Sequence, residues 1–163
     1  MEENKRIILV GPACAGKTYI RDKFRKRGFD VGVSWTTRPK REGEVQDVDY
    51  YFTTIEYFEA LINCDGFYEW AKVDDYYYGT LAEDWKELSQ VFIMETDGIS
   101  KIRPEDRASC LIIYINTPFD TRLKRMRERG WSDEKISTRV KIDQQKFRDF
   151  TDYDLEINSE IHI

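Results

Sequence analysis

The feature that most constrains the fold is the stretch Gly-Pro-Ala-Cys-Ala-Gly-Lys-Thr at residues 11–18, a complete G-x-x-x-x-G-K-[ST] loop. An apolar run at 6–10 precedes it, and the segment at 19–27 places Ile20 and Phe24 on one helical face. This order predicts a buried parallel strand, a tight loop and a helix that stops at Gly28. Glycines in such a loop let backbone N–H groups point at phosphate oxygens, so the pattern predicts a nucleoside triphosphate site.

Two side chains of the loop supply the chemistry. Lys17 is placed to reach the β and γ phosphates, and the Thr18 hydroxyl to ligate Mg²⁺, which makes Mg²⁺ the expected cofactor. We expect the whole loop to contact the nucleotide, through Gly11, Pro12, Ala13, Cys14, Ala15, Gly16, Lys17 and Thr18.

Composition narrows the function classes. A chain of 163 residues fits one domain, and its net charge of −5 argues against a general nucleic-acid binder. The cysteines, three in number, are too scattered for a disulfide framework or a zinc site, so we expect a reduced, cytoplasmic setting. No apolar stretch approaches the roughly 20 residues that cross a bilayer, and we expect no membrane association.

A second cationic element follows an expected strand at 30–34. Arg38 and Arg41 lie three apart in a loop with Pro39 and Gly43. Guanidinium groups bind phosphate oxygens bidentately, and the hydroxyls of Tyr50 and Tyr78 are suitable neutral donors beside them. A solvated charged turn next to aromatic core strands is the alternative that composition leaves open.

Four later motifs occur in a fixed order after the phosphate loop: S-x-T-T-R-x-x-R-x-G-E from 34, V-D-Y-x-F from 48, F-x-E-W from 67 and Y-Y-G-T from 77. Together they resemble the guanylate kinase family over nearly the whole chain. The resemblance implies an α/β P-loop kinase fold with a central parallel sheet flanked by helices. It also implies a core at 1–33, 81–121 and 140–163, a small, mainly antiparallel GMP-binding subdomain at 34–80, and a helical lid at 122–139. A helix at 54–63, capped by Thr54, belongs to that subdomain.

The resemblance implies roles for the residues around GMP. Arg38, Arg41, Tyr50 and Tyr78 would hold its phosphate, and Ser34, Glu69 and Thr80 would read its base, with Gly79 and Glu95 also in the GMP site. The role of Glu69 is chemically sensible, because guanine presents two adjacent donors, N1–H and N2–H₂, to a carboxylate. Adenine lacks this pair and would leave the buried carboxylate unpartnered.

The segment at 122–139 is basic, is interrupted at Gly130 and restarts at a Ser132 cap, which predicts a hinged helix pair. By resemblance, Arg125, Arg129 and Arg139 approach ATP and the transferring phosphoryl group. Arg122 and Arg127 remain alternatives, because helical phase does not decide between them. Asn158, in an expected last strand at 153–158, matches a position near the adenine.

This sequence also departs from the family pattern. Cys14 occupies a place that usually holds a small Ser or Gly, and Trp35 replaces a small or polar residue. The segment at 91–98 is one residue short where the family carries D-x-D, so that either Glu95 or Asp97 supplies the carboxylate.

The implied reaction is transfer of the γ-phosphoryl group of ATP to GMP, and to dGMP, by a monomer or homodimer. Its catalytic residues would be Lys17, Arg38, Arg41, Arg129 and Arg139. Two alternatives stay open: a non-catalytic guanylate-kinase-like domain that binds a phosphopeptide, and a related P-loop kinase with a different phosphate acceptor. An NTPase without any acceptor is a third class, which the GMP-site motifs disfavour.

Overall fold

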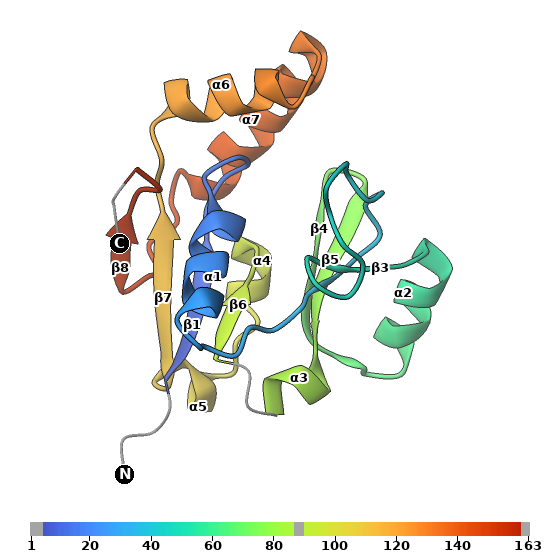
Figure 1. Ribbon diagram of the computed structural model, residues 1–163. Helices are drawn as coiled ribbons and strands as arrows, with labels where there is room; N and C mark the ends of the chain where they lie inside the picture. Colours follow the sequence, from blue (N-terminus) through green and yellow to red (C-terminus); the bar gives the residue numbers. More distant parts are fainter. Residues whose placement is uncertain (1–4, 87–89, 161–163) are drawn as a thin grey trace.

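A computed structural model describes residues 5–86 and 90–160 (Figure 1). The expected α/β fold is confirmed: a parallel sheet lies between helices, and a second sheet stands beside it. Within the described residues, no helix has both the length and the apolar character needed to cross a membrane.

The main sheet has the strand order β6-β1-β7-β8, and its strands pair in parallel throughout. Its strands are β1 (Arg6–Val10), β6 (Val91–Ile93), β7 (Cys110–Ile115) and β8 (Leu155–Ile157). In the register, Ile8 of β1 faces Phe92 on one side and Ile112 on the other. These short apolar runs suit strands that are covered on both faces.

Successive residues of β1 point to opposite faces of the sheet. Leu9 packs with Ile20 of α1 (Lys17–Lys26), so that α1 covers one face. Ile8 and Val10 belong to the cluster on the other face, which includes residues from three further helices. Those helices are α3 (Ala82–Lys86), α4 (Thr96–Ile99) and α7 (Asp133–Phe147). A single turn, α5 (Pro104–Arg107), leads into β7.

The second sheet has the order β3-β2-β5-β4. Its strands are β2 (Trp35–Thr36), β3 (Tyr51–Phe52), β4 (Phe67–Val73) and β5 (Tyr76–Leu81). The β2–β5 and β4–β5 pairs are antiparallel and the β2–β3 pair is parallel. Helix α2 (Ile55–Asn63) begins at the predicted cap, where the Thr54 side chain accepts a hydrogen bond from the Tyr57 N–H. Its buried Phe58 stacks on Phe67, with ring centres 4.3 Å apart.

The basic segment forms two helices, α6 (Phe119–Glu128) and α7, as predicted. Gly130 has a φ of +74° between them, and the Ser132 side chain accepts a hydrogen bond from the Lys135 N–H at the start of α7. Met126 of α6 and Ile136 of α7 pack with Ala13 of the phosphate loop. The helix pair therefore rests directly on the loop between β1 and α1 (Figure 1).

The prediction of a strand at 30–34 is wrong. The segment forms a single parallel bridge, between Val31 and Val91, and the Gly32 N–H donates to the Val91 carbonyl at 2.9 Å. Beyond that point the chain crosses to the other sheet, where the Ser34 carbonyl accepts from the Tyr51 N–H at 3.0 Å. The segment is divided between two sheets, so neither extends a ladder along it.

Candidate nucleotide-binding site

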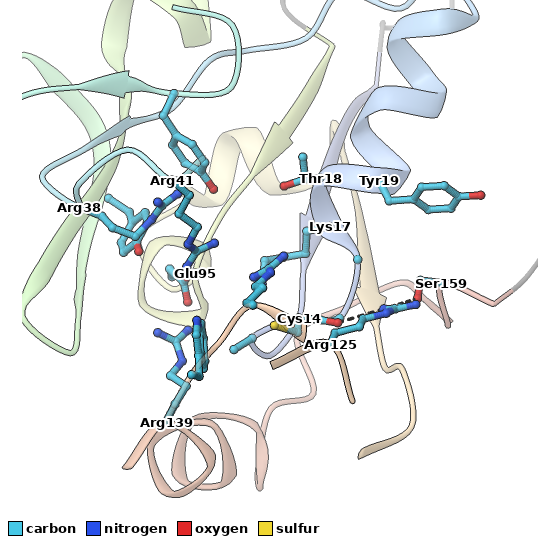
Figure 2. Close-up of a pocket in the computed structure, with 17 residues that line it drawn as sticks. Cys14, Lys17, Thr18, Tyr19, Arg38, Arg41, Glu95, Arg125, Arg139 and Ser159 are labelled. Atoms are coloured by element: carbon cyan, nitrogen blue, oxygen red, sulfur yellow. Dashed lines mark hydrogen bonds between the residues drawn. The ribbon is translucent and has the colours of Figure 1, made fainter. Parts of the chain in front are cut away.

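A pocket of about 330 Å³ lies where the phosphate loop, the helix pair and the second sheet meet (Figure 2). Figure 2 shows Arg38, Arg41, Glu95 and Arg139 on one side of it, and Cys14, Lys17 and Arg125 on the other. The described residues that line it are Ala13, Cys14, Ala15, Gly16, Lys17, Thr18, Tyr19, Arg38, Arg41, Tyr50, Tyr78, Glu95, Arg125, Arg129, Trp131, Arg139 and Ser159.

The charge of this lining is strongly one-sided. Six of its described residues are Lys or Arg, and one, Glu95, is a carboxylate. The six cations come from α1, the loop after β2, α6 with the residue that follows it, and α7, which are far apart in the sequence. In a protein whose net charge is −5, this concentration of cations is suited to a polyanion such as a nucleotide phosphate chain.

The phosphate loop wraps the N-terminus of α1, as its motif predicts. Gly16 has a φ of +100°, a value that favours glycine, and a Cβ there would lie 2.6 Å from the Ser159 Cβ. A Cβ at Gly11 would lie 2.5 Å from the Ile115 carbonyl oxygen, so the loop also packs closely on β7. Cys14 is buried and adopts a φ of +59°, an uncommon conformation for a residue with a side chain.

Lys17 and Thr18 both line the pocket. The Lys17 ammonium group donates to the carbonyl oxygens of Gly11 and Pro12, the second at 3.1 Å. Burial lowers the pKa of Lys17, and the Glu95 carboxylate partly opposes this shift. An anion bound here would compensate the buried charge, which is the setting expected of a phosphate-binding lysine.

The cationic loop of the second sheet is organised by Glu44. Its two carboxylate oxygens accept hydrogen bonds from the Arg38 guanidinium group at 2.9 and 3.0 Å, and one of them also accepts from the Arg41 N–H at 2.7 Å. Burial lowers the pKa of Arg41, and the nearby charges of Arg38 and Arg129 lower it further. Glu44 therefore holds the arginine loop in shape, a role that the sequence reasoning did not assign, although Glu44 ends its first motif.

The tyrosines beside these arginines remain neutral. Burial raises the pKa of Tyr50 to about 12, and burial likewise raises the pKa of Tyr78. Their rings meet edge to face, with centres 6.2 Å apart, and Arg38 lies 5.4 Å above the Tyr50 ring. Both hydroxyls thus stay protonated at neutral pH and can donate to a phosphate oxygen.

A second, smaller cavity adjoins the first and shares Tyr50, Tyr78 and Glu95 with it. Its other described lining residues are Ser34, Glu69, Gly79, Ile93 and Met94. Glu69 is 4% exposed, and burial raises the pKa of its carboxyl group to about 7. The Thr80 hydroxyl donates to it at 2.6 Å, and the Ser34 hydroxyl donates to the Ile93 carbonyl at 3.4 Å. The cavity therefore contains a buried carboxyl group, and hydrogen bonds from the hydroxyl and the backbone N–H of Thr80 oppose the rise in its pKa.

Helix α4 borders this carboxyl group closely. A Cβ added to Gly98 would lie 2.1 Å from Glu69 Oε2, so only a glycine fits at that position. Sequence reasoning did not identify Gly98, because nothing in the local pattern shows that β4 passes so near α4.

The helix pair contributes Arg125, Arg129 and Arg139 to the pocket, and the alternatives Arg122 and Arg127 do not line it. The Arg125 guanidinium group donates to the Cys14 carbonyl at 3.0 Å and to the Ser159 hydroxyl at 2.9 Å. Trp131, from the turn between the helices, also lines the pocket, and the Arg41 guanidinium carbon lies 5.8 Å from its ring centre.

The acidic residues after β6 and the residues after β8 differ in whether they line the pocket. Glu95 lines both cavities, whereas the exposed Asp97 forms an ion pair with Lys146 at 3.7 Å. Asn158 does not line the pocket; its side chain accepts from the Glu160 N–H at 2.9 Å. Its neighbour Ser159 does line it and is held by Thr117, whose hydroxyl lies 3.0 Å away.

The pocket also fits a Mg²⁺ ion that arrives with a nucleotide. Such an ion usually takes one or two protein ligands and completes its shell with phosphate oxygens and water. Thr18 has an exposed hydroxyl beside the loop, and Glu95 supplies an oxygen donor in the same pocket. These are the hard oxygen donors that Mg²⁺ prefers.

Comparison with known proteins agrees with this geometry. The family model described as guanylate kinase matches residues 3–161. Among solved structures, the chain is similar to one described as the crystal structure of guanylate kinase from Anaplasma phagocytophilum. The TM-score is 0.77 at 23% sequence identity, and the match covers 99% of this chain and 79% of that one.

Proposed function

Since this chain belongs to the guanylate kinase family, we propose that it transfers the γ-phosphoryl group of ATP to GMP, and also to dGMP, giving ADP and GDP. The proposal assigns a role to each segment: residues 34–80 bind GMP, residues 122–139 act as a lid over ATP, and the remaining residues form the core.

The observation that carries this proposal is the pair of adjoining cavities. One has six cationic residues and the phosphate loop, and the other contains the buried Glu69 carboxyl group. Tyr50, Tyr78 and Glu95 line both. The smaller cavity has a volume of about 10 Å³ in this structure, so it would widen to admit a guanine. The phosphate of that ligand would extend past the tyrosines into the larger cavity, toward the phosphate loop. A nucleoside monophosphate beside a nucleoside triphosphate is the ligand pair that this arrangement suits.

In the acceptor site, Arg38, Arg41, Tyr50 and Tyr78 would bind the GMP phosphate. The Glu69 carboxylate would accept from the guanine N1–H and N2–H₂. Ser34 or Thr80 would donate to O6 once its hydroxyl turns from its present acceptor, the Ile93 carbonyl or the Glu69 carboxyl group. Specificity would follow because adenine leaves the same carboxylate without donors. Glu44, which pairs with Arg38, would keep the arginine loop ready for the phosphate.

The chemistry requires no separate base. A GMP phosphate oxygen is already anionic near neutral pH, so catalysis would consist of positioning and charge stabilisation. Lys17, Arg129 and Arg139 would stabilise the negative charge that develops on the transferring group, while Arg38 and Arg41 aim the acceptor. Thr18 and Glu95 are the residues that would hold Mg²⁺, which when bound neutralises charge on the ATP phosphates.

The direct test is ADP formation from ATP and Mg²⁺ with GMP, dGMP, AMP, CMP and UMP supplied in turn. Turnover confined to the guanine nucleotides is expected. Lys17→Ala and Arg41→Ala should each lower turnover at least about a hundredfold, the scale expected for one preorganised charge donor. GMP binding without turnover would favour the phosphopeptide-binding alternative, and turnover with another acceptor would favour a related kinase.

A further inference from the structure

Asp143 of α7 is a buried carboxylate that no motif singled out. It is 4% exposed, and its partner Arg139 lines the cationic pocket. Its Oδ2 accepts a hydrogen bond from the backbone N–H of Ala13 in the phosphate loop, at 2.9 Å. Its Oδ1 accepts from Nε of Arg139, one turn earlier on α7, at 3.1 Å.

The two contacts join Asp143 to different parts of the proposed active site. Ala13 belongs to the loop that would hold the ATP phosphates, and Arg139 lines the pocket. The Arg122 guanidinium group approaches the same carboxylate at 3.9 Å from α6. Burying a carboxylate is costly unless it is paired, and here it is paired with a backbone donor and with guanidinium groups from both helices.

The two contacts have specific consequences for geometry. The residue after Ala13 is Cys14, which holds a φ of +59°, so the loop adopts an uncommon conformation just where Asp143 grips it. On the other side, Asp143 occupies Nε of Arg139 and leaves the terminal guanidinium nitrogens available to face the pocket. Figure 2 shows Arg139 directed toward the pocket beside Glu95.

We propose that Asp143 is a positioning residue for phosphoryl transfer: one carboxylate fixes the phosphate loop through the Ala13 N–H and aims the Arg139 guanidinium group at the transferring phosphate. This inference rests on the proposed kinase function. The Asp143 carboxylate links α7 to the phosphate loop, so that the same group places Arg139 and the ATP phosphates.

A buried ion pair with a purely structural role would show different behaviour. Its loss would lower the free energy of unfolding, while the folded fraction would keep its kinetic constants. A positioning role instead changes kcat in the folded enzyme, and the change depends on whether Arg139 is present.

The test uses Asp143→Asn and Asp143→Ala, with the exposed Asp149→Asn as a matched control. Asparagine keeps an oxygen that can accept from the Ala13 N–H but loses the charge that holds Arg139. We therefore expect Asp143→Asn to lower kcat at least about tenfold and to change the affinity for a fluorescent ATP analogue less than about threefold. Asp143→Ala should lower kcat and also weaken the binding of the ATP analogue. Thermal unfolding of each variant fixes the folded fraction to which rates are referred.

A double-mutant cycle isolates the path through Arg139. In an Arg139→Ala background, Asp143→Asn should lower kcat by less than about twofold, because the residue it aims is gone. Wild-type kcat in folded Asp143→Asn, or the full tenfold loss in both backgrounds, would overturn the proposal. If the wild-type enzyme phosphorylated no nucleotide, the kinase function would fail first. The ATP-analogue affinities would then still test the loop contact, since equal affinities for Asp143→Ala and wild type would refute it.

Discussion

Glu69 is deeply buried and lines the smaller cavity, and this combination predicts a pH dependence of GMP binding. Burial raises its pKa to about 7, and only the ionised form can accept both guanine donors. Affinity for GMP should therefore rise as pH rises through 7. At pH 6 about one-tenth of Glu69 is ionised, so KM for GMP should be roughly tenfold higher than at pH 8.

The Glu69→Gln variant separates this effect from titration of the GMP phosphate, whose second pKa is near 6. Its KM for GMP should keep only the dependence due to the phosphate, and its preference for GMP over AMP should fall at least about tenfold. Steady-state kinetics from pH 6 to 8 with both acceptors measure the two quantities. Identical pH profiles for wild type and variant would show that Glu69 does not bind the base.

Trp131 is a second side chain with a measurable role, because it links the helix pair to the arginine loop. Its ring centre lies 5.8 Å from the Arg41 guanidinium carbon and 4.4 Å from the Lys135 ammonium nitrogen. Cation–π contacts of this kind contribute about 0.5–2 kcal/mol. Trp131→Ala should lower kcat/KM for GMP about two- to thirtyfold, and Trp131→Phe should retain part of the activity. Equal kinetics for all three proteins would show that the contact is incidental.

Helix α4 closely limits the space around Glu69. Because a Cβ at Gly98 would meet Glu69 Oε2 at 2.1 Å, Gly98→Ala must displace either the helix or the carboxyl group. We expect KM for GMP to rise at least about tenfold while KM for ATP stays within about twofold. Ser100→Ala, an exposed position at the end of the same helix, is the control. A Gly98→Ala enzyme with wild-type KM for GMP would contradict this account of the cavity.

The elements that the sequence predicted well are those whose signals are local. The apolar run, the glycine loop and the helix after it follow one another without interruption, and Thr54 caps α2 as its type suggests. The prediction of a strand at 30–34 was wrong because the pairing of this segment depends on residues of two sheets that are distant in the sequence.

The site shows the same division between local and distant signals. Motifs pointed to Lys17, Arg38 and Arg41, whereas the choice of Arg125 over Arg122 depends on the phase of α6 against the loop, which only packing reveals. Ser159 and Asp143 reach the phosphate loop from more than a hundred residues along the chain. Their sequence surroundings contain no signal of that contact.

The molecule as a whole should become less stable as pH rises toward neutrality on account of Glu69. Its folded pKa of about 7 exceeds the ordinary value of 4.5, so the native state binds this proton more tightly than the unfolded chain does. The resulting contribution, about 3 kcal/mol, is complete below about pH 4.5 and is lost as pH rises through 7.

Urea unfolding of the nucleotide-free protein between pH 4.5 and 8 measures this contribution. The difference in free energy of unfolding between wild type and Glu69→Gln should change by about 3 kcal/mol across that range, to the disadvantage of wild type at high pH. Glu44 and Asp49, whose pKa values are lowered, lose their contributions as pH falls, and they cancel in the difference. Parallel stability curves would contradict the burial of a titrating Glu69.

The central claim is that this chain moves the terminal phosphate of ATP onto GMP, and label transfer tests it most directly. Wild-type protein would be incubated with Mg²⁺, GMP and ATP carrying ³²P at the γ position, with Lys17→Ala as the blank. The account predicts that the label appears in GDP, with little in inorganic phosphate, and that Lys17→Ala forms no labelled GDP above background. Label that remains in ATP, or that passes to water at the same rate with and without GMP, would contradict it.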